Sequence, residues 1–84
     1  MPNIERIQTG ARIEKRLIKV MKALAERLDV PLGELIEGVM LHAMDGRAPF
    51  SESTLREIAL LRQVYGLSLT ADDAHRLTEN GEAQ

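Results

Sequence analysis

The sequence contains no cysteine, one phenylalanine and one tyrosine among its 84 residues. Without cysteine, neither disulfide bonds nor thiolate metal sites can stabilise the chain. With so few aromatic side chains, the hydrophobic core has to be built from Leu, Ile, Val, Met and Ala. A chain of this length forms one small domain whose own core is marginal, so association with a second copy is the expected remedy.

Long apolar runs and enzyme signatures are also missing. No apolar stretch approaches the roughly 20 residues that span a bilayer, and the segment Met1–Arg6 lacks the apolar core of a signal peptide. We therefore expect a soluble, cytoplasmic protein. The sequence has no Gly-rich phosphate loop, nucleophile elbow or zinc signature, and His42 and His75 stand without a ligand cluster. We predict no enzymatic activity, no cofactor and no metal.

The net charge of −2 argues against a nucleic-acid partner, but the distribution of charge does not. Residues 1–28 hold seven Lys or Arg and three Glu, a net of +4. Residues 29–84 hold four Arg and ten acidic residues, a net of −6. Such asymmetry indicates a basic working surface and an acidic remainder. The alternative is that a small protein scatters its charges unevenly by chance.

Residues 6–13 alternate with the period of two that is typical of a β-strand. One face carries Ile7, Thr9, Ala11 and Ile13, and the other, which we call the ribbon face, carries Arg6, Gln8, Gly10 and Arg12. A single strand followed only by helices cannot pair its own backbone N–H and C=O groups. The same strand of a second copy is the simplest partner. The resulting two-stranded ribbon would fit the major groove of DNA, and a solvated strand face is the alternative.

The rest of the chain is predicted to be helical. Gly38 lies inside the second predicted helix, where glycine costs about 1 kcal/mol relative to alanine. Either this glycine permits close helix packing, such as across a dimer interface, or an exposed face tolerates it. Asp45 and Gly46 end that helix, and Ser51 caps the third. The predicted helices span residues 14–28, 32–44 and 51–65, with a short fourth helix at residues 71–77.

Two consecutive stretches carry a resemblance to a known family. Residues 11–28 are similar to the strand end and first helix, and residues 29–36 to the turn and second-helix start, of ribbon-helix-helix proteins. These are bacterial DNA-binding proteins of the Arc and Met repressor type, and the resemblance covers about residues 6–45. It implies a mostly α fold with one N-terminal β-strand, an intertwined homodimer with a two-stranded antiparallel ribbon, and a transcriptional regulator, most often a repressor.

The resemblance also implies which residues contact DNA. Gln8, Gly10 and Arg12 match the base-contacting positions, where Arg12 would bind guanine and Gln8 adenine. The backbone N–H groups of Leu32 and Gly33 would bind a phosphate at the start of the second helix. Further phosphate contacts would come from Lys15, Arg16, Lys19 and Lys22, for which a solvated helix face is the alternative. Two positions depart from the family pattern: Gly10 offers no side chain, and Pro31 replaces the usual Ser or Thr.

The sequence divides into two regions of one domain. We expect residues 1–46 to form a DNA-binding and dimerisation region, and residues 47–84 to form a C-terminal helical extension packed on the same domain. The alternative function follows from that extension. An acidic, Leu-rich C-terminal half can bind a protein partner, as a helical interaction module or an antitoxin-like adaptor.

Overall fold

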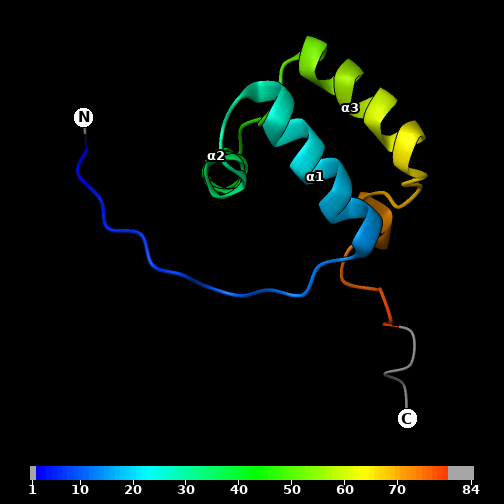
Figure 1. The fold of residues 1–84 in the computed structure, drawn as a ribbon, viewed down its shortest axis with the longest axis horizontal. Coiled ribbons are helices and arrows are strands. Elements are labelled where there is room, and N and C mark those ends of the chain that lie inside the picture. Colours follow the sequence, from blue (N-terminus) through cyan, green and yellow to red (C-terminus); the bar gives the residue numbers. More distant parts are fainter. Residues whose placement is uncertain (1, 80–84) are drawn as a thin grey trace.

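The computed structural model describes residues 2–79, which contain three α-helices and one short 3-10 helix. The three predicted long helices are confirmed, each to within a residue. Residues 2–14 precede the first helix (Figure 1). The elements are α1 (Lys15–Leu28), α2 (Leu32–Met44), α3 (Glu52–Tyr65) and η1 (Ala71–Asp73).

Local capping sets the ends of α1 and α3. The Glu14 side chain accepts a hydrogen bond of 2.8 Å from the backbone N–H of Leu17, which satisfies one free donor of the first turn. Ser51 caps α3 in the same manner. Both helices end at a residue in the left-handed conformation, Asp29 with φ of 58° and Gly66 with φ of 66°. The Ser51 cap is the one that the sequence predicted.

α3 packs along α1 and closes one side of the helical body (Figure 1). The buried centre consists of Leu24, Ala25 and Leu35. Two exposed polar contacts also connect α1 and α3: Arg27 donates to Glu57 at 2.6 Å, and Arg16 donates to the carbonyl oxygen of Gly66 at 3.2 Å. The partly buried residues around the centre are Val30, Leu32, Val39, Phe50, Ile58 and Leu61.

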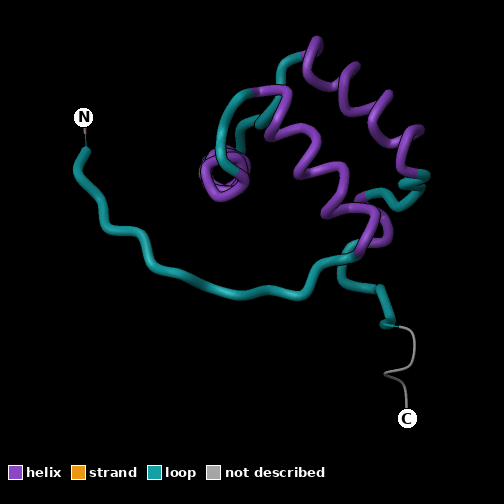
Figure 2. The backbone as a smooth tube through the Cα atoms, in the orientation of Figure 1, coloured by secondary structure: helices purple, strands orange, loops and turns teal. Residues whose placement is uncertain are grey.

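The strand predicted at residues 6–13 is absent from the part of the single chain that the structure describes. These residues form an extended segment outside the helical body (Figures 1 and 2). Within residues 2–79, none of their backbone groups takes part in a backbone hydrogen bond. The physical reason is that one chain supplies no second strand to complete the ladder.

The prediction of a fourth α-helix at residues 71–77 is wrong in length and type. Thr70 does cap the element, in a capping box with Asp73, but only the 3-10 turn η1 forms. Ala74 is extended, and His75 has φ of 68°, which interrupts any helix. A single helical turn needs tertiary packing to persist, and Leu77 is 54% exposed.

The chain on its own covers little of its apolar surface. Val20, Leu24, Ala25, Leu35 and Leu67 are the buried hydrophobic residues of the described chain. The accessible surface is 7359 Å², whereas a folded monomer of 9.4 kDa is expected to expose about 5000 Å². The radius of gyration is 14.4 Å, against about 12 Å for a compact chain of this length. None of the described helices is long and apolar enough to cross a bilayer.

Candidate nucleic-acid interface

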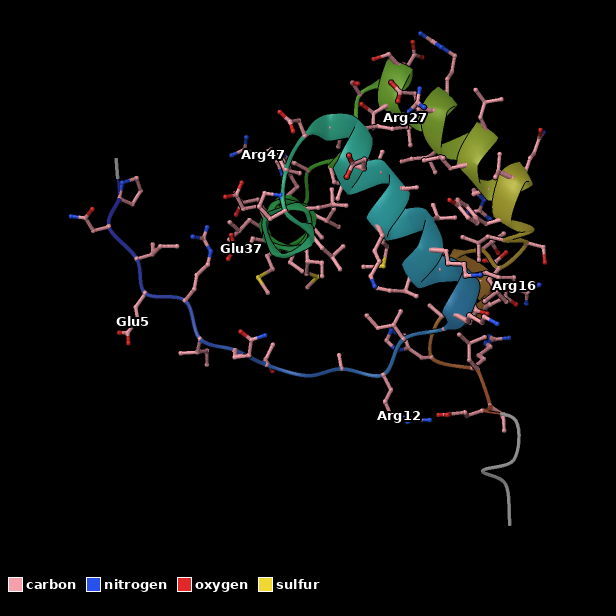
Figure 3. All side chains as sticks on the ribbon, viewed as in Figure 1. Glu5, Arg12, Arg16, Arg27, Glu37 and Arg47 are labelled. Atoms are coloured by element: carbon pink, nitrogen blue, oxygen red, sulfur yellow. The ribbon has the colours of Figure 1, made fainter. Side chains whose placement is uncertain are left out.

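The three predicted base-contacting residues all lie on the N-terminal segment. Gln8, Gly10 and Arg12 are exposed, and a Cβ added at Gly10 would meet no atom within 4 Å. Arg12 is held by the chain itself, because its guanidinium forms an ion pair with the carboxylate of Glu79. Figure 3 shows the Arg12 side chain reaching toward the C-terminal part of the chain. The structure therefore keeps this face accessible, with Arg12 already paired.

A second arginine of the ribbon face is also paired. Arg6 donates two hydrogen bonds to Glu37 of α2, from Nε to Oε2 at 2.8 Å and from Nη2 to Oε1 at 3.0 Å. The hydrogen bond from Arg6 lowers the pKa of Glu37 below its ordinary value of 4.5, and the same contact raises the pKa of Arg6. Sequence reasoning placed Arg6 on this face but missed Glu37 and Glu79, which lie 31 and 67 residues from their partners.

The predicted phosphate-contacting side chains on α1 divide into two groups. Lys15, Lys19 and Lys22 recur at helical spacing along one exposed face, opposite the buried Leu24. Within residues 2–79 these three lysines form no ion pair or side-chain hydrogen bond. Arg16 differs, since it pairs with Glu14 at 3.4 Å and donates to the end of α3. We call Lys15, Lys19 and Lys22 the lysine row.

The N-terminus of α2 presents free backbone donors. Pro31 occupies the N-cap position and makes no side-chain hydrogen bond to the first turn. The N–H groups of Leu32 and Gly33 therefore lack a side-chain acceptor, and the helix dipole favours an anion there. A Cβ at Gly33 would meet nothing within 4 Å, so a ligand has room to approach. Glu34 in the same turn opposes an incoming phosphate.

An apolar groove is lined mainly by α1 and α2, with Ile58 and Arg62 of α3 at its border. Its volume is about 320 Å³, and Arg62 is the one charged residue among those that line it. Two of its lining side chains on α2, Ile36 and Met40, are 37% and 46% exposed, and Met44 further along the helix is 75% exposed. Such an exposed apolar surface next to an unpaired chain segment is typical of an interface that a partner covers.

The other polar candidates serve local structure. His42 on α2 lies with Nδ1 2.7 Å from the carbonyl oxygen of Gly38. A Cβ at Gly38 would meet no atom within 4 Å. Close packing of helices within one chain therefore does not require a glycine at this position. In the part of the protein that the structure describes, no three His, Cys, Asp or Glu side chains are grouped to hold a metal ion.

The chain was compared with models of protein families, with curated proteins and with solved structures. None of the three comparisons found a match.

Proposed function

We propose that the protein is a homodimeric ribbon-helix-helix DNA-binding protein that regulates transcription, acting as a repressor by occupying a promoter. One observation carries the proposal. A basic segment, whose backbone groups form no backbone hydrogen bond within residues 2–79, directly precedes α1, and the apolar groove lined mainly by α1 and α2 lies open. A second copy meets both needs, because its strand can pair antiparallel with residues 6–13 while its helices cover the groove.

The exposed area supports a dimer of this kind. The single chain exposes about 2,300 Å² more than a compact monomer of its mass is expected to expose. Obligate homodimers bury 2,000–5,000 Å² in total, largely apolar. The excess on each chain is therefore large enough for an intertwined interface. Leu17, Ile36 and Met40 would become core residues of that dimer.

The distribution of basic groups supports DNA as the ligand. In an antiparallel ribbon, Gln8, Gly10 and Arg12 would each occur twice on one face, which fits a two-fold symmetric site in the major groove. The lysine row and the free N–H groups of Leu32 and Gly33 would bind flanking phosphates. A ribbon that inserts at Gly10 would approach the bases closely, because no side chain separates the backbone from the groove.

The test is fluorescence anisotropy with two labelled duplexes, the DNA upstream of this protein's own gene and a scrambled sequence, across a salt series. We expect selective binding to the upstream duplex and an affinity that falls steeply as salt rises. Failure to bind either duplex at low salt would contradict the proposal.

Two substitutions separate base contact from phosphate contact. Arg12→Ala should lose about 1–3 kcal/mol of discrimination between the duplexes with little change in the slope of affinity against salt. Lys19→Ala should weaken both duplexes alike and reduce that slope by about 1. Arg56→Ala, which removes an exposed arginine from α3, is the matched control. If Arg12→Ala and Lys19→Ala both bind like this control, the ribbon geometry is wrong.

A protein-interaction module is the second candidate function, and one observation favours it. The outer side of α3 exposes Leu60 and Val64, by 62% and 71%. An apolar helix face of this kind can bind in the groove of a partner protein. If the protein is an interaction module, Leu60→Asp should abolish partner binding. If it is a DNA-binding protein, Leu60→Asp should leave DNA binding unchanged.

A further inference from the structure

We propose that the chain carries its own competitor for DNA: Glu79 and Glu37 hold the two arginines of the ribbon face, and DNA has to displace both carboxylates. This inference rests on the proposed DNA-binding function and adds a regulatory contact to it. Its elements are Arg12 with Glu79 and Arg6 with Glu37. Both carboxylates come from the acidic part of the chain, residues 29–84.

The contact at Arg12 occupies two donors that a base can also use. Arg12 Nε donates to Glu79 Oε1 at 3.2 Å, and its Nη2 pairs with the second carboxylate oxygen. Recognition of guanine requires two parallel donors of the same guanidinium. One guanidinium cannot present this pair of donors to a carboxylate and to a base at once. A base that approaches this edge of the guanidinium therefore has to displace the carboxylate of Glu79.

The C-terminal segment is placed to make this contact. Leu77, Thr78 and Glu79 line one cleft, of about 900 Å³, together with residues 11–16. The cleft thus joins the end of the ribbon segment, the start of α1 and the C-terminal segment, as the placement of Arg12 in Figure 3 illustrates. Glu79 thus contacts the ribbon face at the end that carries Arg12.

The contact at Arg6 covers the other end of the same face. Arg6 and Arg12 are six residues apart, an even number, so an extended strand presents them on one side. Glu37 binds Arg6 through two hydrogen bonds, at 2.8 and 3.0 Å. In Figure 3, Glu37 lies on the side of α2 nearer the N-terminal segment. Both guanidinium groups of the ribbon face are thus neutralised by the chain's own carboxylates.

The competitor tunes DNA affinity rather than blocking it. The paired side chains remain largely solvated, with Arg12 76% and Glu79 50% exposed. Exposed ion pairs of this kind change an equilibrium by about 2- to 5-fold each, and salt screens them. The effect of removing either carboxylate should therefore be largest at low salt and fade as the ionic strength rises.

The experiment measures affinity for the upstream duplex by anisotropy, with the full chain and the variants Glu79→Gln, Glu37→Gln and the double variant. We expect tightening of about 2- to 5-fold for Glu79→Gln and of about 5- to 20-fold for the double variant. Glu52→Gln removes the same charge from the start of α3, far from the N-terminal segment (Figure 1). It should change the affinity by less than about 1.5-fold, because distant charges are screened.

The pairing partner is tested in an Arg12→Ala background. There, Glu79→Gln should lose its advantage and behave like Glu52→Gln. Equal affinity of Glu79→Gln and Glu52→Gln in the wild-type background would overturn the competitor while leaving DNA binding intact. No DNA binding by any variant at low salt would overturn the proposed function and the competitor together. Circular dichroism melting curves that match the wild type confirm that the variants are folded.

Discussion

The two long sides of α1 differ in how completely the chain covers them. On the α3 side, Ile58 and Leu61 pack against the buried centre, and the exposed contacts of Arg27 with Glu57 and of Arg16 with Gly66 also connect the helix pair. Next to it, an apolar groove of about 320 Å³ lies open, lined mainly by α1 and α2 and bordered by Ile58 and Arg62 of α3. Under the proposed dimer, the first interface is completed within the chain and the second copy covers the groove.

The pattern of α2 explains this difference. On α2, Leu35 belongs to the buried centre and Val39 packs against it. Ile36, Met40 and Met44 continue the apolar surface around the helix but remain exposed. A helix with so wide an apolar surface buries only part of it against one neighbour. The remainder is the surface that we assign to the dimer.

The largest expected effect comes from a charge placed on the uncovered side. Met40→Asp would bury an unpaired carboxylate twice in a symmetric dimer, at a cost of about 6 kcal/mol per dimer. We expect the variant to sediment as a monomer and to lose DNA binding. Leu60→Asp, on the outer side of α3, is the matched control and should sediment as the wild type does. A dimeric Met40→Asp protein would show that the groove is not the interface.

The next largest effect should come from the centre that both sides share. Leu24 is 3% exposed, so Leu24→Ala creates a cavity and should lower the free energy of unfolding by about 2–5 kcal/mol. Leu60→Ala, at a 62% exposed position, should change it by less than about 0.5 kcal/mol. Urea denaturation at fixed protein concentration measures both. Similar values for the two would mean that Leu24 is not at the centre of the core.

A smaller effect sharpens where the partner lies. Gly38→Ala adds a Cβ that meets nothing within 4 Å of its own chain, and alanine gains about 1 kcal/mol over glycine in helix propensity. We expect a stabilisation of about 0.5–1 kcal/mol. Gly66→Ala, at φ of +66°, should destabilise by about 1 kcal/mol. A destabilised Gly38→Ala dimer would instead place the second copy against this glycine.

The smallest effect concerns pH at the junction of the N-terminal segment and α1. The hydrogen bond from the Leu17 N–H lowers the pKa of Glu14 below its ordinary value of 4.5. Glu14 therefore binds a proton more readily in the unfolded chain than in the folded chain. This contribution to stability is complete above pH 4.5 and is lost as the pH falls through the lower pKa of the folded state. In Glu14→Gln, the melting temperature should fall less steeply as the pH is lowered over that range. If the melting temperature of the variant and of the wild type depend on pH equally, this cap does not contribute.

The helices could be predicted because their signals are local. Ser51 and Gly66 bound α3 through a cap and a left-handed residue, and Pro31 fixes the start of α2. The missing fourth helix shows the limit of such signals, since Thr70 caps it correctly but residues 74–79 remain exposed. Local chemistry starts an element, and tertiary contacts decide whether it continues.

The candidate site could be predicted only in part. Alternation with period two identified Gln8, Gly10 and Arg12 as one face, and helical spacing identified the lysine row. No sequence pattern pairs Arg12 with Glu79, because their separation of 67 residues is bridged only in the folded chain. The proposed strand would need a second molecule for its backbone pairing, which one chain cannot supply.

The most direct test of the central claim is amide hydrogen exchange at residues 6–13, measured by NMR on the full chain without DNA. An antiparallel ribbon between two copies would bond every second amide of each strand. We predict alternate protection of about 100-fold or more in the wild type, and none in Met40→Asp. Uniformly rapid exchange in a protein that sediments as a dimer would contradict the ribbon and, with it, this mode of DNA binding.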